Sequence, residues 1–144
     1  MKNSEILKDE ARIQQECVIF YRNTRCLLNH RPRCLIFSIP NEGDPFLTQI
    51  GALPGASDLL AIHRNTMAET PQIHFVEVKT PTGVLSKKQV KFSKQIIDMG
   101  LSYDVVRSLD EFKKLINSWC KWKNVYYNAE INENVYTIKK IASH

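Results

Sequence analysis

The stretch that decides the fold is Ile73-His74-Phe75-Val76-Glu77-Val78-Lys79-Thr80, a short run rich in β-branched and aromatic residues. Such a run is typical of a buried β-strand. Because side chains alternate between the two faces of a strand, Glu77 and Lys79 share one face, and His74 occupies the other, where we expect a structural role. A carboxylate and an ammonium at the end of an apolar strand must pair, bind a metal or take part in chemistry, since their burial is otherwise costly.

A third charged residue is predicted to join this pair. The upstream segment is Gly51-Ala52-Leu53-Pro54-Gly55-Ala56-Ser57-Asp58-Leu59-Leu60-Ala61-Ile62, in which a turn marked by glycine and proline delivers Asp58 to the start of an apolar strand. If the loop at residues 64–71 lets the two strands pair antiparallel, Asp58 lies beside Glu77 and Lys79. We therefore expect one aspartate, one glutamate and one lysine to converge.

The order and spacing of these residues resemble the catalytic pattern of the PD-(D/E)XK nuclease superfamily, in particular its VRR-Nuc (virus-type replication-repair nuclease) branch. The resemblance extends from about residue 10 to residue 112, and we find no match beyond Trp119. The matching positions are Asn41, Gly51, Pro54-Gly55-Ala56-Ser57-Asp58-Leu59, Glu77-Val78-Lys79, Gly83-Val84-Leu85-Ser86 and Gln89. The resemblance implies an α/β fold with a restriction-endonuclease-like core, in which helices flank a central mixed sheet.

The hydrophobic pattern predicts the element order α-β-β-β-α-β-α within one domain, residues 1–120. The predicted helices cover residues 4–23, 86–99 and 110–119, and the predicted strands cover residues 34–39, 58–62, 73–80 and 103–106. Ser86 and Gln89 form a capping box at the start of the second helix. Residues 121–144 are an extension that could form a hairpin, contact nucleic acid, or pack against the same domain or a second subunit.

The first predicted helix places Glu10 in the middle of its apolar side. That side is formed by Ile6, Ile13, Cys17, Phe20 and Tyr21. In nucleases of the superfamily that this chain resembles, a glutamate on the first helix often reaches the active site. Two alternatives stay open. Glu10 could instead pair with a lysine or arginine one turn away, and Glu16, nearer the edge of the apolar side, could be the carboxylate at the site.

The expected cluster suits hydrolysis of a phosphodiester with Mg²⁺ or Mn²⁺. Asp58 and Glu77 supply the hard oxygen ligands that these ions prefer, and the Val78 carbonyl is a plausible further ligand. Glu10 could hold one of the waters that complete the coordination shell. Lys79 can orient the attacking water or stabilise charge on the phosphoryl group, and we favour the electrostatic role.

Contact with nucleic acid is predicted at the start of the second helix and in the turn after the first strand. The candidate residues are Lys87, Lys88, Lys91, Ser86 and Asn41. Lysines in such a run are often only solvated, but here they follow the charged strand directly, where a polyanion at the site would pass. Glu42 and Asp44 would repel phosphate near Asn41. The resemblance also places Gln89 close to the catalytic cluster, although capping is a sufficient structural role for it.

Composition narrows the functional class. The chain has 144 residues, a formal net charge of +5 and a pI near 9.1, a modest basic excess that suits a polyanionic partner. It contains no apolar run of the roughly 20 residues that a membrane span needs, and no glycine-rich phosphate loop that would support ATP hydrolysis. Its four cysteines show no Cys-x-x-Cys spacing, which favours reduced thiols in the cytoplasm. A zinc site at Cys26, His30 and Cys34 is disfavoured because a fourth ligand is missing.

The leading hypothesis is a metal-dependent DNA endonuclease that cuts branched replication or recombination intermediates in DNA repair, as the resemblance implies. Small stand-alone members of the branch resemble Holliday-junction resolvases, so we expect a homodimer. The alternatives are a flap or nicking nuclease and a non-catalytic nucleic-acid-binding module. The least favoured alternative is a soluble protein whose charged strand end is only an ion pair. The resemblance is also compatible with a virus-encoded protein.

Overall fold

The structure, a computed structural model, describes residues 2–24, 34–40, 45–64, 70–119, 127–132 and 135–140. The elements are α1 (Lys2–Thr24), β1 (Cys34–Ser38), α2 (Pro45–Gln49), β2 (Leu59–His63), β3 (Gln72–Val78), α3 (Lys87–Asp98), β4 (Ser102–Val106), α4 (Leu109–Trp119), β5 (Tyr127–Asn132) and β6 (Val135–Lys140). The predicted order is confirmed through α4, with one short helix, α2, added between β1 and β2.

Four strands form one mixed sheet in the order β1-β2-β3-β4. Strand β2 pairs antiparallel with both β1 and β3, whereas β3 and β4 run parallel. A parallel pair needs a long crossover connection, and α3 supplies it between β3 and β4. The predicted α/β fold with a central mixed sheet is therefore confirmed.

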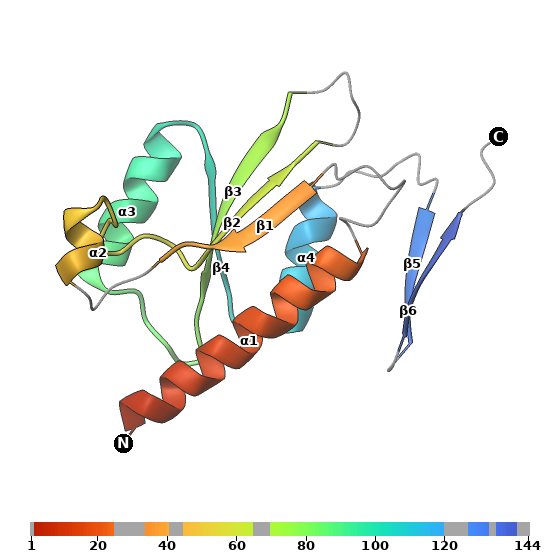
Figure 1. The fold of residues 1–144 in the computed structure, drawn as a ribbon, viewed down its shortest axis with the longest axis horizontal. Helices are drawn as coiled ribbons and strands as arrows, with labels where there is room; N and C mark the ends of the chain where they lie inside the picture. Colours follow the sequence, from red (N-terminus) through yellow and green to blue (C-terminus); the bar gives the residue numbers. More distant parts are fainter. Residues whose placement is uncertain are drawn as a thin grey trace.

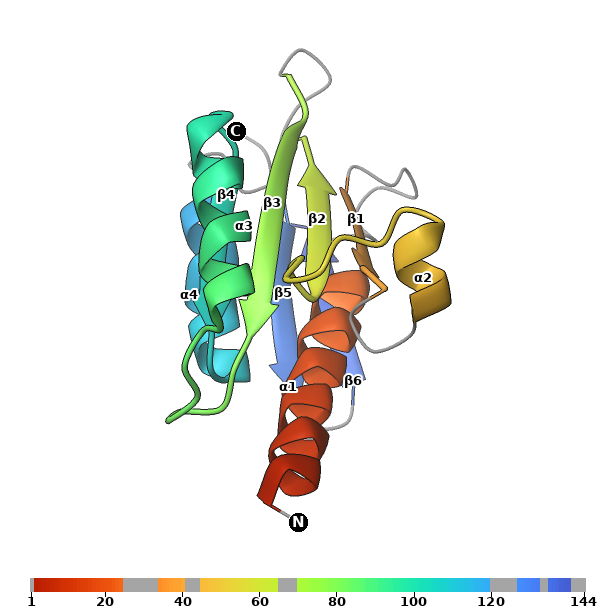
Figure 2. The same cartoon turned by 90° about the vertical axis from the view of Figure 1, so that its left-hand side faces the viewer.

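Helices cover both faces of the sheet. Helices α1 and α4 lie on one face, and α2 and α3 lie on the other (Figures 1 and 2). The larger core lies under α1 and α4, where Tyr21, Leu59 and Phe112 are almost fully buried. A smaller apolar cluster on the α3 face contains Phe92 and Ile96. Strands β2 and β3 therefore present their side chains to two different environments.

Local sequence fixes how the loop before β2 meets α3. Ser86 is the N-cap of α3, and the capping box with Gln89 is confirmed. Gly55 has a φ of +86°, and a side-chain carbon at this position would lie 2.5 Å from the Lys88 backbone. Only glycine tolerates both this conformation and this close approach. The contact holds the segment just before Asp58 against the first turn of α3.

Two features differ from the predicted pattern. The turn expected after the first strand was predicted to include Pro45, and this is wrong, because helix α2 begins at Pro45. A helix of five residues is too short to show a periodic pattern, and proline fits the first turn, where its missing N–H would have no partner. Ile6, expected on the buried side of α1, is 42% exposed, because the first turns of α1 extend beyond the sheet (Figure 1).

The chain continues past α4 with a small separate sheet. Strands β5 and β6 pair antiparallel in a two-stranded sheet, which is one of the arrangements expected for the C-terminal extension. The boundary between a domain of residues 1–120 and an extension of residues 121–144 stays a prediction. None of the helices in the described ranges combines the length and the apolar character that crossing a bilayer requires.

Candidate active site

The antiparallel pairing of β2 and β3 brings Asp58 and Glu77 together. Asp58 immediately precedes β2, and Glu77 and Val78 are the last residues of β3. The Asp58 Oδ2 atom accepts a hydrogen bond of 2.7 Å from the Val78 amide. The Asp58 carboxyl also lies within hydrogen-bonding reach of the Glu77 carboxyl. The recorded contact of Val78 is made by its amide, so a metal-ligand role for its carbonyl stays a prediction.

Lys79 lies between two glutamates. Its Nζ atom is 3.9 Å from Glu77 Oε1 and 4.0 Å from Glu10 Oε1, and its side chain is only 12% exposed. Both distances are long for an ion pair, so the ammonium is shared between the two carboxylates. The structure thus brings Asp58, Glu77 and Lys79 together as the sequence indicates.

Helix α1 contributes Glu10 to the cluster. Besides Lys79, the Glu10 carboxylate contacts the backbone N–H of Thr80, which follows Lys79 in the chain. Glu16 instead forms a 2.8 Å ion pair with Arg12 on the exposed side of α1. Of the two candidate carboxylates on this helix, Glu10 is therefore the one placed at the site.

Gln89 makes two contacts that the sequence presented as alternatives. Its Oε1 atom accepts a 2.8 Å hydrogen bond from the Ser86 amide, which completes the capping box. Its Nε2 atom donates a 2.8 Å hydrogen bond to Glu77 Oε1. Because the cap engages the amide oxygen, the amide nitrogen must face the carboxylate. The helix cap therefore orients Gln89 toward the site.

Glu77 is the most strongly perturbed acid of the cluster. It is 1% exposed, and its pKa is raised to about 9 by burial and by the Asp58 carboxyl, while Lys79 acts in the opposite direction. Its Oε2 atom is buried and has no hydrogen-bond partner among the residues that the structure describes. Burial also raises the pKa of Glu10, and the charge of Asp58 adds to that effect. Buried acids arranged in this way are unfavourable unless positive charge is added.

These donors fit a hard divalent cation. A cation held by Asp58 and Glu77 would offset the repulsion between the two carboxylates and give Glu77 Oε2 a partner. Within the described ranges, no group of three His, Cys, Asp or Glu side chains is arranged to hold a metal. The two carboxyl groups of Asp58 and Glu77 are of the kind that Mg²⁺ takes, since this ion keeps several waters beside about one or two protein carboxylates.

Two solved structures are similar to this chain. One, described as a VRR_NUC domain, is 23% identical with a TM-score of 0.54, and the match covers 78% of this chain and 98% of that one. The other, described as a VRR_NUC domain protein, is 16% identical with a TM-score of 0.53, and the match covers 75% of this chain and 84% of that one. This chain has the fold of a VRR_NUC domain. No protein-family model matches the sequence, and no curated protein matches it.

The VRR_NUC fold agrees with the restriction-endonuclease-like core that the sequence predicts. It also brings two unpredicted residues close to the cluster, both from β4 and its end. The Tyr103 hydroxyl is buried and finds no hydrogen-bond partner in the described part of the chain. Burial raises the pKa of Tyr103, and the charges of Glu77 and Asp58 add to it. Arg107 donates hydrogen bonds to carbonyls of the turn that follows β3. Neither position carries a local sequence signal, because each depends on the parallel pairing of β3 with β4.

His74 lies on the opposite face of the sheet from Glu77, as predicted. Its Nε2 atom is 2.7 Å from His63 Nε2, and its ring stacks on the Trp119 indole with centroids 3.8 Å apart. Burial lowers the pKa of His74 to about 4, and His63 adds to the effect. These contacts support the structural role expected for His74.

The predicted DNA contacts are only partly within the described residues. Lys87, Lys88 and Lys91 are exposed on the first turns of α3. The Ser86 hydroxyl accepts a 3.2 Å hydrogen bond from the Gln89 amide, so its recorded role is that of a helix cap. Asn41 and the two acids expected to repel phosphate beside it, Glu42 and Asp44, lie outside the described ranges. The same holds for Cys26 and His30 of the disfavoured zinc site.

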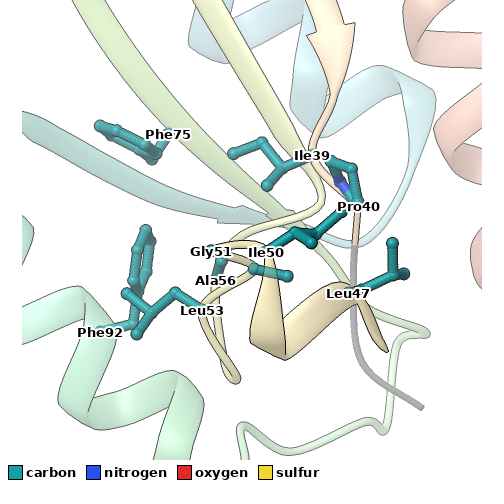
Figure 3. Close-up of a pocket in the computed structure, with 10 residues that line it drawn as sticks. Ile39, Pro40, Leu47, Ile50, Gly51, Leu53, Ala56, Phe75 and Phe92 are labelled. Carbon is teal, nitrogen blue, oxygen red and sulfur yellow. The ribbon is translucent and has the colours of Figure 1, made fainter. Parts of the chain in front are cut away.

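An apolar cavity of about 400 Å³ adjoins the site on the α3 face of the VRR_NUC fold (Figure 3). Phe75 of β3 and Phe92 of α3 line one side, and the segment between α2 and β2 lines the other. Phe75 is two residues from Glu77, yet the lining contains none of the acids of the cluster. The cavity therefore borders the reactive groups without contributing to them.

Proposed function

We propose that this chain is a metal-dependent DNA endonuclease that hydrolyses phosphodiester bonds in branched DNA. The observation that carries the proposal is the convergence of Asp58, Glu77 and Lys79, in which the buried Glu77 Oε2 atom lacks a hydrogen-bond partner among the described residues. The similarity in fold to two VRR_NUC structures supports a nuclease.

Each residue of the cluster has a distinct role in this proposal. Asp58 and Glu77 hold Mg²⁺ or Mn²⁺, with the Val78 carbonyl as a further ligand. The bound ion supplies Lewis-acid stabilisation of the phosphoryl group and lowers the pKa of water. Gln89 keeps the Glu77 carboxylate in place through its 2.8 Å hydrogen bond.

Lys79 and Glu10 act on the reacting groups from the α1 side. The Lys79 ammonium supplies positive charge where negative charge grows on the phosphoryl oxygens, in a site that is largely shielded from water. Glu10 holds Lys79 at 4.0 Å and offers its carboxylate to a water.

DNA reaches this site along α3. The exposed lysines of its first turns contact phosphates, which fixes the position of the duplex without reading its sequence. We propose a branched substrate such as a four-way junction, cut by a homodimer. Two active sites related by a twofold axis would cut a symmetric junction at matching positions.

The test is cleavage of a four-way DNA junction with Mg²⁺ or Mn²⁺, compared with a linear duplex and a flap. We expect paired, metal-dependent cuts whose rate falls at least about 100-fold in Glu77→Gln and Lys79→Met, with junction binding retained. The matched controls are Glu16→Gln, on the exposed side of α1, and Lys113→Met, whose ammonium lies over the Phe20 ring on the other face. Both controls should cut at the wild-type rate.

The other outcomes separate the alternatives. Cuts confined to the flap keep the site and replace the resolvase with a flap nuclease. Binding of DNA without cutting under either metal contradicts the nuclease and supports a non-catalytic module. Light scattering that gives a monomer, free and on the junction, removes the homodimer.

A further inference from the structure

Arg107 makes an unusual set of contacts just after β4. Its side chain is partly buried, and its Nη1 atom donates hydrogen bonds of 2.7 Å to the carbonyls of both Thr80 and Gly83. A weaker contact of 3.5 Å reaches the Pro81 carbonyl between them. The Gly83 amide in turn donates to the Thr80 carbonyl at 3.1 Å, which closes the turn at residues 80–83. One nitrogen of the guanidinium therefore holds both ends of this turn.

The turn at residues 80–83 touches two groups of the candidate active site. Lys79 immediately precedes it, and the Thr80 backbone N–H binds the Glu10 carboxylate. The return of the turn also packs on the Lys79 stem, because a side-chain carbon built at Gly83 would lie 3.4 Å from Lys79 Cδ. The position of the turn thus sets the positions of the Lys79 ammonium and the Glu10 carboxylate.

Arg107 is itself held firmly. Its backbone N–H donates a 2.8 Å hydrogen bond to Glu111 Oε2 in the first turn of α4. One residue earlier, the Val106 carbonyl accepts a 3.0 Å hydrogen bond from the Lys79 amide. The Val106 carbonyl therefore ties the end of β3 to β4, and the Arg107 side chain ties the turn beyond β3 to the segment between β4 and α4.

We propose that Arg107 is a positioning residue for the reaction: it fixes the turn at residues 80–83 and thereby holds Lys79 and Glu10 in their working positions. The inference rests on the proposed nuclease function. It assigns the guanidinium to backbone carbonyls rather than to DNA, so loss of Arg107 must affect the rate of the chemical step more than the binding of substrate.

The experiment compares Arg107→Met and Arg107→Lys with the matched control Arg22→Met in the full chain. Arg22 also donates to a backbone carbonyl, that of Ile36 at 3.1 Å, but on β1. The first measurement is hydrogen exchange of the Gly83 amide, which needs no activity. We expect exchange to accelerate about tenfold or more in Arg107→Met and to stay at the wild-type rate in Arg22→Met.

The second measurement is metal-dependent cleavage. We expect kcat to fall by about 10- to 100-fold in Arg107→Met with KM changed by less than about threefold, and Arg107→Lys to recover part of the rate. Adding Arg107→Met to Lys79→Met should cost much less than it costs in the wild type, because the residue acts partly through Lys79.

Several results would overturn the inference. A raised KM with unchanged kcat would make Arg107 a phosphate contact. An equal loss of kcat in Arg22→Met would reduce its effect to general stability, and unchanged exchange at Gly83 would show that the turn does not depend on it. A wild-type chain that cuts no DNA refutes the proposed function, and with it the catalytic part of this inference, while accelerated exchange at Gly83 would still establish the contact itself.

Discussion

A pair of titratable side chains lies on each face of the sheet at β2 and β3, and the two pairs are built differently. On the α4 face, His63 and His74 meet through their Nε2 atoms at 2.7 Å, and both rings lie parallel to the Trp119 indole. On the α3 face, Asp58 and Glu77 lie together. The Lys79 ammonium lies between Glu77 and Glu10, at 3.9 and 4.0 Å from their carboxylate oxygens.

The two pairs differ in charge. Two neutral imidazoles meet through their Nε2 atoms as one donor and one acceptor, so this contact needs no added charge, although the buried His74 Nδ1 atom finds no hydrogen-bond partner among the described residues. Two carboxyl groups can hydrogen-bond to each other only while one of them holds a proton, which is what the raised pKa of Glu77 describes, and Glu77 Oε2 lacks a partner within the described residues. The first pair therefore belongs to the fold, whereas the second is an incomplete arrangement of the kind that marks a functional site.

The largest expected effect comes from substituting one member of each pair and comparing the effects on cleavage and on stability. Glu77→Gln should lower metal-dependent cleavage by about 100-fold or more, because it removes a proposed metal ligand. The same variant should unfold in metal-free urea at or above the wild-type midpoint, because the neutral amide avoids the cost of burying or protonating an acid beside Asp58. His74→Gln should show the reverse, with a lower midpoint and near-normal cleavage where it is folded. If the Glu77→Gln protein were strongly destabilised, the carboxyl pair would contribute to the stability of the fold as well.

Acidification should weaken the histidine pair. The pKa of His74 is lowered from 6.5 to about 4, so the unfolded chain binds a proton more readily than the folded chain between these values. Its contribution is complete above about pH 6.5 and is lost as the pH falls toward 4, a loss on the order of 3 kcal/mol. Because the raised pKa of Glu77 makes acidification stabilise the fold at that residue, the His74 contribution is measured as the difference between wild type and His74→Phe in urea unfolding at about pH 7 and about pH 4.5. His74→Phe, which keeps a ring on Trp119, should show a smaller loss; an equal loss would place the acid sensitivity elsewhere.

The sequence predicted those parts of the site that depend on local rules. Alternation along one strand and one antiparallel hairpin suffice to place Asp58, Glu77 and Lys79 together. Helical periodicity shows that Glu10 points inward, but not that it meets Lys79, because that contact depends on how α1 docks on the sheet. The capping box of Gln89 is a local pattern too, and its contact with Glu77 follows only once α3 lies beside β3.

The unpredicted parts depend on contacts between distant segments. Tyr103 and Arg107 reach the site only because β4 pairs parallel with β3 through the α3 crossover. No pattern in the neighbouring sequence predicts that pairing. Helix α2 is too short for periodicity to reveal it. The histidine pair was half predicted: alternation placed His74 on the correct face, but the contact with His63 and Trp119 required the docking of α4.

Divalent metal should complete the carboxylate pair and leave the histidine pair unaffected. Mg²⁺ or Mn²⁺ at about 100 times its dissociation constant should stabilise the wild type by about 2.7 kcal/mol, since it binds the folded chain alone. The thermal unfolding midpoint in metal and in EDTA measures this effect. It should vanish in Glu77→Gln and persist in His74→Gln, and a shift that survives in Glu77→Gln would place the metal elsewhere.

The smallest expected effect distinguishes the two faces by their contact with DNA. Lys91→Gln, on the exposed side of α3, should weaken junction binding a few-fold. It should also lower the slope of log binding constant against log salt concentration by about one, the value expected for one lost phosphate contact. Cleavage at saturating DNA should not change, because the substitution leaves the acids of the site intact. Lys113→Gln removes the same charge from α4, on the face of the histidine pair, and should change neither quantity. Titrations at several salt concentrations decide the matter: equal losses in both variants would mean that net charge, rather than the α3 face, attracts the DNA.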